Sequence, residues 1–134
     1  MEALRYVFSK LYYTTNIDDF IEENEGWIYD YAIYMACRDT QGQKEWFEWE
    51  EKYRKRDPKA MKEFAATNED EILFWQFTQY EFFRQWGELK AYANERGIEI
   101  MGDMPLYISD DSTEVWAHPE LFLLNGDGAP TEVA

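Results

Sequence analysis

The polar side chains that could carry chemistry in this chain gather in its C-terminal third. Asp103 directly follows a short β-branched run, a place where a carboxylate either serves a site or caps the next turn. Asp111 and Ser112, with Trp116 close by, could form part of the wall of a binding groove, or they could cap a short helical turn that ends at Trp116. The simpler interpretation, a capped turn with a core tryptophan, is the one we favour for these three residues.

Two further side chains with possible chemistry have plainer interpretations. His118 stands alone before a proline, without ligand partners at metal spacing, so we predict neither a metal site nor a cofactor. Cys37 lies on an apolar helical stretch and is most simply a buried thiol. A single cysteine cannot form an internal disulfide. Since the N-terminus lacks the basic start and apolar stretch of a signal peptide, we expect a cytoplasmic protein.

The aromatic content exceeds what one small core requires. Six Trp, ten Tyr and nine Phe make up 19% of the 134 residues. Aromatic rings bind sugars by stacking, but they suit protein interfaces equally well. Trp46 and Trp49 could line a sugar groove, although packing between helices is the interpretation we prefer.

The charge excludes several classes of partner. Twenty-eight acidic and thirteen basic side chains give a net charge of −15. Such a chain is repelled by nucleic-acid phosphates and by anionic lipid, so we predict neither partner. No run of about 18 apolar residues is present, so we also predict no membrane span.

Helices must position these residues. Apolar residues at three- and four-residue intervals predict helices from about Asp18, with a break at Gly26 and a stop at Gly42. Asp57-Pro58 predicts the capped start of a helix over 59–66. A longer helix is predicted from about 69 to 95, with a broad aromatic face that we expect to be mostly core, and it ends at Gly97.

A different pattern follows this long helix. Residues 98–103 predict a β-strand, and no convincing partner strand lies nearby in the sequence. The turn signal at 125–128 could join 121–124 to 131–134 as a hairpin. An orphan strand after helices indicates a mainly α chain that ends in one strand and loop of an incomplete α/β sheet.

The sequence from residue 79 onward resembles one family. The matching words are Gln79-Tyr80, Arg84-Gln85-Trp86, Leu89 to Asn94, Gly97-Ile98, Gly102 to Ile108, Asp111-Ser112, Val115-Trp116, Pro119 to Phe122 and Gly128-Ala129-Pro130. Upstream, Glu23-Asn24, Trp27, Asp30-Tyr31-Ala32, Met35-Ala36, Trp46, Trp49 and Arg56-Asp57-Pro58 also fit. In this ordered series the chain is similar to 4-α-glucanotransferases, the amylomaltase or disproportionating-enzyme family.

The resemblance implies a division of the chain. Residues 1–97 would form a helical insertion subdomain, and residues 98–134 the third strand of a (β/α)₈ barrel with its following loop or hairpin. A complete barrel needs roughly 250 residues, so we expect this chain to be an internal fragment of the enzyme.

The chemistry implied by the resemblance is a retaining transfer of α-1,4-glucan segments between maltooligosaccharides. It needs an Asp nucleophile and a Glu acid/base, with carboxyl groups about 5–5.5 Å apart. The family carries these residues on later strands, so we expect no catalytic residue in this chain and no activity from it alone. Asp103 matches a supporting position that orients an arginine and the nucleophile. Asp111, Ser112 and Trp116 would be substrate-binding.

Two functions of other classes stay open. The chain could be a non-catalytic module that grips α-glucan through its aromatic rings. It could instead be a truncated, self-associating interaction protein that complements a missing half. Apolar surface meant for the barrel would be exposed in the isolated chain, which makes a homodimer plausible.

Overall fold

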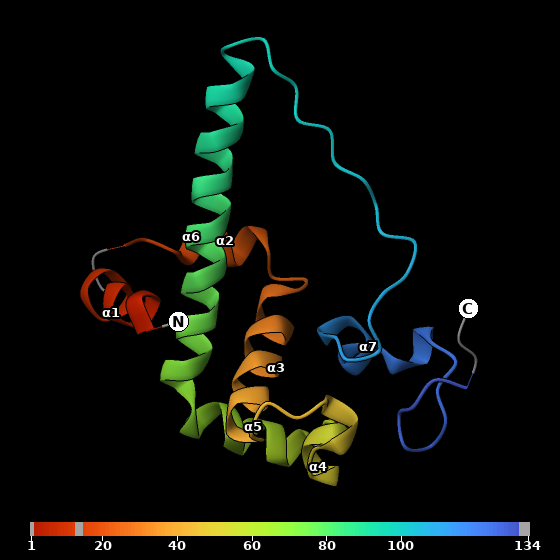
Figure 1. Cartoon of the computed structure of the whole chain (residues 1–134). Helices are drawn as coiled ribbons and strands as arrows, with labels where there is room; N and C mark the ends of the chain where they lie inside the picture. The colour runs from red at the N-terminus through yellow and green to blue at the C-terminus, as the bar shows by residue number, and fades with distance from the viewer. Residues whose placement is uncertain (1, 13–14, 132–134) are drawn as a thin grey trace.

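The chain folds into a mainly helical structure, as predicted. The computed structural model describes residues 2–12 and 15–131 (Figure 1). Its elements are α1 (Glu2–Leu11), α2 (Asp18–Glu23), α3 (Ile28–Thr40), the 3₁₀ helix η2 (Trp46–Glu48), α4 (Glu51–Arg54), α5 (Pro58–Thr67), α6 (Glu69–Asn94), α7 (Thr113–Ala117) and the 3₁₀ helix η3 (Pro119–Leu121). No β-strand occurs within the described ranges.

Side-chain caps fix where several helices begin. The Asp57 carboxylate accepts a hydrogen bond from the Ala60 N–H at 2.9 Å, with Pro58 in the first turn of α5. Ser112 Oγ accepts from the Val115 N–H at the start of α7, at 3.4 Å. Both caps confirm the predicted helix starts, because a short polar side chain satisfies an N–H that has no partner within the helix.

Glycines end the helices where the backbone turns left-handed. Gly42 follows α3 with φ of 72°, and Gly97 follows α6 with φ of 71°. The Ile98 N–H then bonds back to the Ala93 carbonyl oxygen at 3.1 Å, which closes the end of α6. These conformations cost glycine little because it has no Cβ.

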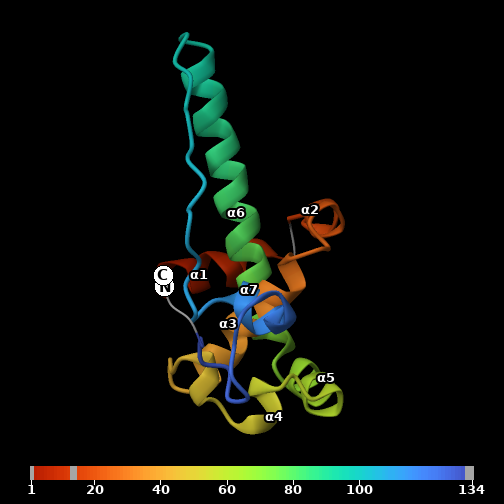
Figure 2. The ribbon, with the colours of Figure 1, turned by 90° about the vertical axis from the view of Figure 1, so that its right-hand side faces the viewer.

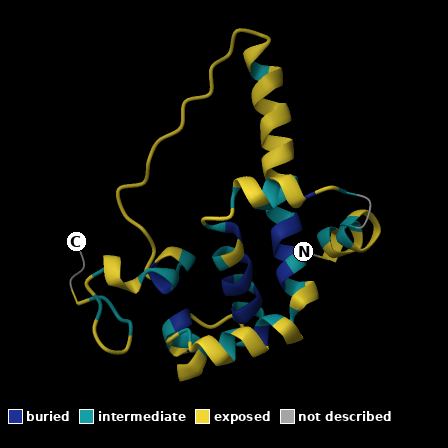
Figure 3. Ribbon diagram, turned by 180° about the vertical axis from the view of Figure 1, so that it is seen from behind, coloured by how far each residue is buried: buried dark blue, intermediate teal, exposed yellow. Residues whose placement is uncertain are grey.

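The core lies where α3, the first half of α6 and α7 meet. Ala32, Ala36 and Cys37 of α3 are fully buried, as is Phe74 of α6, while Trp116 of α7 is 1% exposed. Figure 3 shows the buried positions concentrated in these elements. Helix α1 is held against α6, because Arg5 forms a bidentate ion pair with Glu71, with N–O distances of 2.8 and 2.9 Å.

The expectation that the aromatic face of the 69–95 helix is mostly core is correct for only half of α6. Ile72, Phe74 and Phe77 are buried, but Phe82, Trp86 and Leu89 are 41–58% exposed. Figures 1 and 2 show the second half of α6 rising out of the helical body. Periodicity predicts which side chains share a face, but not how far along the helix that face is covered.

The run predicted as a strand, residues 98–103, is extended but not paired. No backbone hydrogen bond joins residues 99–109 to another described residue. A strand needs a neighbour to complete its ladder, and none of the described residues supplies one. The prediction of an orphan strand therefore corresponds to an extended segment without a ladder.

The predicted hairpin is present as one antiparallel bridge between Leu124 and Pro130. The Asn125 N–H bonds to the Ala129 carbonyl oxygen, and the Thr131 N–H to that of Leu123, both at 2.8 Å. Residues 132–134 of the predicted second strand lie outside the described residues. None of the described helices has the length and apolar character needed to cross a membrane.

Candidate functional site

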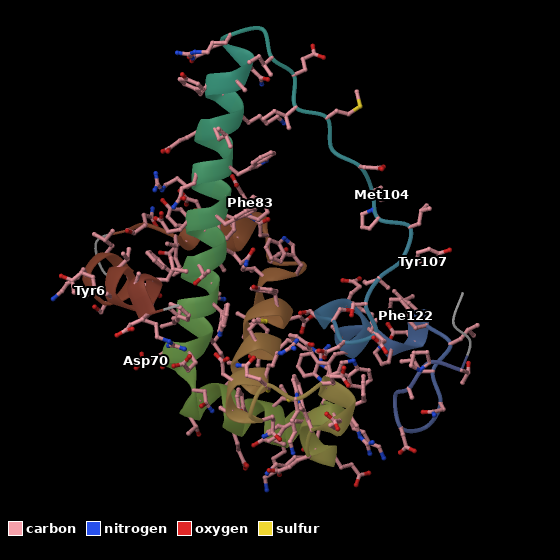
Figure 4. All side chains as sticks on the ribbon, in the orientation of Figure 1. Tyr6, Asp70, Phe83, Met104, Tyr107 and Phe122 are labelled. Atoms are coloured by element: carbon pink, nitrogen blue, oxygen red, sulfur yellow. The ribbon has the colours of Figure 1, made fainter. Side chains whose placement is uncertain are left out.

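Asp103 lies on the extended segment between α6 and α7. It is exposed, and it makes no hydrogen bond or ion pair with the described residues. The next residue, Met104, is 84% exposed, and Figure 4 shows Met104 and Tyr107 away from the helical body. Asp103 therefore has no hydrogen bond or ion pair with the other candidate residues.

Asp111 is bound on several sides where the chain returns to the helical body. Its Oδ1 accepts hydrogen bonds from the Tyr34 hydroxyl at 2.7 Å and the Trp46 N–H at 3.1 Å. Its Oδ2 lies 2.9 Å from Arg38 Nη1. The side chain is 12% exposed, so these contacts hold in a site with little water.

This environment raises the pKa of Tyr34. Burial of the phenol is the main cause, and the hydrogen bond to the Asp111 carboxylate adds to it. Ionising Tyr34 would place a second negative charge beside Asp111. The pair is therefore arranged as a neutral donor on a charged acceptor.

Ser112 and Trp116 are built into the same unit. Ser112 caps α7, and Trp116 Nε1 donates to the Tyr53 carbonyl oxygen at 3.0 Å. The guanidinium of Arg56 lies 4.7 Å from the centre of the Trp116 ring. Since Trp116 is buried and both its ring and its N–H are engaged, its geometry is that of a core tryptophan.

The structure thus brings three of the four predicted residues together and leaves Asp103 apart. Asp111, Ser112 and Trp116 join the loop before α7 to α3, η2 and α4. The partner groups Tyr34, Arg38 and Arg56 were missed from the sequence. Their only local signal was polar character on otherwise apolar or basic stretches, and that does not reveal contacts made some 60 to 80 residues away.

Trp46 and Trp49 are packed. They are 3% and 4% exposed, and Trp46 Nε1 donates to the Asp110 carbonyl oxygen at 2.7 Å. A Cβ built on Gly128 would lie 2.4 Å from the Trp46 ring, so the turn at 125–128 closes directly over it. This confirms packing as the main role of both tryptophans.

One open pocket of 410 Å³ borders Trp46. Its walls are Trp46, Arg54, Lys55, Pro119, Glu120, Phe122, Leu124 and the turn over 125–128. The Nε of Arg54 is buried without a hydrogen-bond partner, while its Nη1 lies 3.4 Å from an Asp127 carboxylate oxygen. The pocket combines apolar and charged walls, as sites for polar organic ligands do.

The potential for other chemistry is limited. No group of three or more His, Cys, Asp and Glu side chains that could hold a metal occurs in the described part of the chain. His118 Nδ1 lies 3.5 Å from a Glu120 carboxylate oxygen. Cys37 is fully buried as predicted, and burial raises the pKa of its thiol to about 12.

Comparison with known proteins gives one consistent result. The sequence model of a family described as 4-alpha-glucanotransferase matches residues 1–133. The 4-alpha-glucanotransferase of Aquifex aeolicus is 42% identical over 99% of this chain and 27% of its own length. That of Thermus thermophilus is 48% identical over 86% of this chain and 23% of its own length.

A solved structure agrees with these relatives. The chain is similar to an amylomaltase from Streptococcus agalactiae in complex with acarbose, with a TM-score of 0.83 and 43% identity. The match covers 88% of this chain and 24% of that one. The chain therefore spans about a quarter of the length of the relatives it matches, and by its sequence and its fold it belongs to the 4-alpha-glucanotransferase family.

Proposed function

We propose that this chain is the helical and third-strand region of an enzyme that transfers α-1,4-glucan segments between maltooligosaccharides. The observation that carries the proposal is the family match over residues 1–133, together with 42% identity to a relative of that name. The acarbose bound to the similar amylomaltase supports a saccharide as the substrate class. The reaction is a retaining double displacement, in which a carboxylate holds the glucosyl group until a second sugar hydroxyl takes it.

The proposed roles of the candidate residues differ. Asp103 supports the reacting centre: its exposed carboxylate is unpaired within the described chain and can orient groups supplied from elsewhere. Asp111, Ser112 and Trp116 support the wall of the substrate groove from behind. Their own side chains are engaged in holding the loop in place. No pair of carboxylates in the described residues is assigned the nucleophile and acid roles, so we propose that the chain alone transfers no glucan.

The proposed division into residues 1–97 and 98–134 is based on the family resemblance of the sequence. Val115 and Trp116 lie in the same core cluster as the buried residues of α3 and α6. The two parts therefore need not fold separately, and residues 110–131 are best regarded as docked on the helical subdomain. We propose a cytoplasmic location, in keeping with a single buried thiol.

The test is transfer between two molecules of maltotriose, which yields glucose and maltopentaose. We expect no glucose from this chain alone. We expect activity from a chimera in which the chain replaces the matching region of the Aquifex aeolicus enzyme. In that chimera, Asp103→Asn should lower kcat at least tenfold with little change in thermal stability. An unchanged rate would remove the supporting role of Asp103, and a folded but inactive parent chimera would count against the proposed function.

A binding-only role is separated in the same experiment. Retention of the free chain on immobilised maltooligosaccharide, together with a folded chimera that shows no turnover, would favour a glucan-binding module. For the isolated chain, exposed apolar side chains on α6 and the extended segment support self-association into a homodimer. The net charge of −15 on each copy opposes it.

A further inference from the structure

A second pocket, of 350 Å³, lies beside the first half of α6 and shares no residue with the candidate site. Helix α5 leads directly into α6, which runs back along α3 (Figure 1). The pocket draws on all three helices, and its walls include Tyr29 of α3, Ala65 and Ala66 of α5, and Glu69, Leu73 and Gln76 of α6. The residues from α6 share one side of that helix because they are spaced by four and three positions. The two alanines leave room beside them.

Gln76 is an unexpected residue at its position. It is 6% exposed and stands between the buried Trp75 and Phe77. Its side-chain amide forms no hydrogen bond with the described residues. Burying an amide without a partner costs stability, and buried polar groups in proteins are nearly always hydrogen-bonded. Since Gln76 lines the pocket, a ligand bound there would supply the partners that the protein itself does not.

Two further polar side chains of the pocket are also unpaired. Neither the Tyr29 phenol nor the Glu69 carboxylate forms a hydrogen bond or ion pair with other described residues. Tyr29 is 48% exposed, so part of its ring is open to solvent. Glu69 and Gln76 are seven residues apart on α6, about 10 Å along the helix axis. An amide, a carboxylate and an aromatic ring are therefore available along two turns of one helix.

These groups suit a neutral ligand that carries several hydroxyl groups. Hydroxyls donate to a carboxylate, and they both donate to and accept from an amide. The C–H face of a sugar ring can pack on the exposed part of the Tyr29 ring. An anion is opposed by Glu69 and by the net charge of −15, and a cation would find only one carboxylate among the lining residues. A pocket about 10 Å long fits two linked sugar rings better than one.

We propose that this pocket is a saccharide-binding site that holds two glucosyl units of an α-1,4-glucan. Gln76 donates to and accepts from sugar hydroxyls, Glu69 accepts from them, and Tyr29 supplies the ring. The choice of glucan rests on the proposed function, whereas the choice of a neutral hydroxylated ligand rests on the pocket alone. None of the residues Asp103, Asp111, Ser112 and Trp116 takes part.

The experiment is a titration of the ¹⁵N-labelled 134-residue chain with maltose, followed by NMR. We expect a Kd on the order of 1 mM, because an open site with few contacts binds a small ligand weakly. The side-chain NH₂ signals of Gln76 and the backbone amide signals of Ala65 and Leu73 should move. Sorbitol, which has the hydroxyls but no ring, should bind at least tenfold more weakly. Putrescine is the probe for a cationic occupant and should not displace maltose.

Gln76→Met keeps the size of the side chain and removes its hydrogen-bonding groups. It should weaken maltose binding at least tenfold and leave the melting temperature equal or higher, because a buried amide without a partner is removed. Gln85→Met is the matched control. Gln85 is exposed on the same helix and lies outside the pocket, so this variant should bind maltose as the parent does. Tyr29→Ala should weaken binding at least threefold from the opposite wall.

A lower melting temperature in Gln76→Met would assign the amide a structural role and overturn the inference, as would parent-like maltose binding by this variant. Displacement of maltose by putrescine, or signal changes confined to residues outside the pocket, would overturn it as well. The titration needs no turnover, so the two proposals fail separately. Maltose binding through Gln76 together with a folded but inactive Aquifex aeolicus chimera would keep the site and count against the proposed function. An active chimera whose free chain does not bind maltose would do the reverse.

Discussion

Asp111 shows how much of a carboxylate's capacity can be used to hold a loop in place. Its two oxygens receive a phenol, a backbone N–H and a guanidinium from α3 and η2. If the carboxylate were removed, each of these donors would lose a hydrogen bond at a largely buried position. Such losses leave unsatisfied polar groups, which cost more than the net gain from forming the bonds.

Asp111→Ala should therefore destabilise the chain by about 2–3 kcal/mol, because it leaves Arg38 unpaired and two buried donors unsatisfied. Asp103→Ala is the control, since Asp103 makes no contact with the described residues and should change the unfolding free energy by less than about 0.5 kcal/mol. Urea unfolding followed by tryptophan fluorescence measures both. Equal effects of the two substitutions would show that the contacts of Asp111 contribute nothing to stability.

Cys37 gives a prediction for alkaline pH. Burial raises its pKa from 9.0 to about 12, so the thiol ionises at a lower pH in the unfolded chain than in the folded one. The unfolded state therefore binds fewer protons above pH 9, and stability falls as the pH rises through this window. Between pH 8 and pH 10 this one group should remove about 1.4 kcal/mol.

The check is urea unfolding of the parent and of Cys37→Ala at both pH values. Tyr31 and Tyr34 also have raised pKa values, but they titrate in both proteins, and their contribution cancels in the comparison. The parent should lose about 1.4 kcal/mol more than the variant on going to pH 10. Parallel losses would mean that the thiol is accessible to solvent in the folded state.

At the scale of elements, the two halves of α6 differ in how much other structure covers them. The first half packs on α3 and α1. At the start of the second half Phe83 contacts the rings of Phe20 and Trp27, and the rest is held by the helix's own hydrogen bonds and by ion pairs such as Arg84–Glu81 and Arg84–Glu88. Pairs of this kind add a few tenths of a kcal/mol each. Isolated helices of that length are marginal in water, so the outer half should open more readily than the inner half.

Gly87→Ala tests this division. Gly87 lies in the middle of the exposed half, and a Cβ there would meet no atom within 4 Å. Alanine should stabilise the helix locally by about 1 kcal/mol and slow amide exchange of residues 84–94 about fivefold. Exchange of the Phe74–Phe77 region should not change. Equal protection of both halves in the parent chain would contradict the division.

Local rules predicted helices α2, α3, α5, α6 and α7, but not α1 or the short helices η2 and α4. Asp57-Pro58, Ser112, Gly42 and Gly97 each fix a helix boundary through a hydrogen bond or a backbone conformation within a few residues. The hydrogen bond between Asp111 and Tyr34 could not be predicted, because the two residues are 77 positions apart in the sequence and meet only through the tertiary fold. The exposure of Trp86 and Leu89 was not predictable for a similar reason: a periodic face looks the same whether or not another element covers it.

The candidate site was predictable only in part. The family resemblance selected Asp103, Asp111, Ser112 and Trp116, and three of these lie together in one docked loop. Their contacts correspond to the capped turn and core tryptophan that the sequence favoured. The structure leaves the role of Asp103 as a prediction, since its functional neighbours would come from polypeptide beyond the described residues.

At the scale of the whole molecule, two forces act in opposite directions on association. The net charge of −15 makes copies repel one another, and the exposed apolar side chains of residues 82–108 make them attract. Figures 1 and 2 show the outer half of α6 and the extended segment after it projecting from the other helices, so these parts of two copies can meet while the remaining helices stay apart. The balance between these forces should therefore depend on ionic strength.

Added salt should strengthen self-association of the isolated chain. Between 20 mM and 500 mM NaCl the screening length falls from about 20 Å to about 4 Å, which removes most of the repulsion between the bodies and leaves the apolar attraction intact. Sedimentation equilibrium should show a dimer constant that rises at least tenfold over this range. In Leu106→Glu the increase should be much smaller, because the extended segment has lost one of its exposed apolar side chains. A dimer that weakens with salt would instead indicate ion pairs at its interface and would exclude the apolar side chains of residues 82–108 as the contact surface.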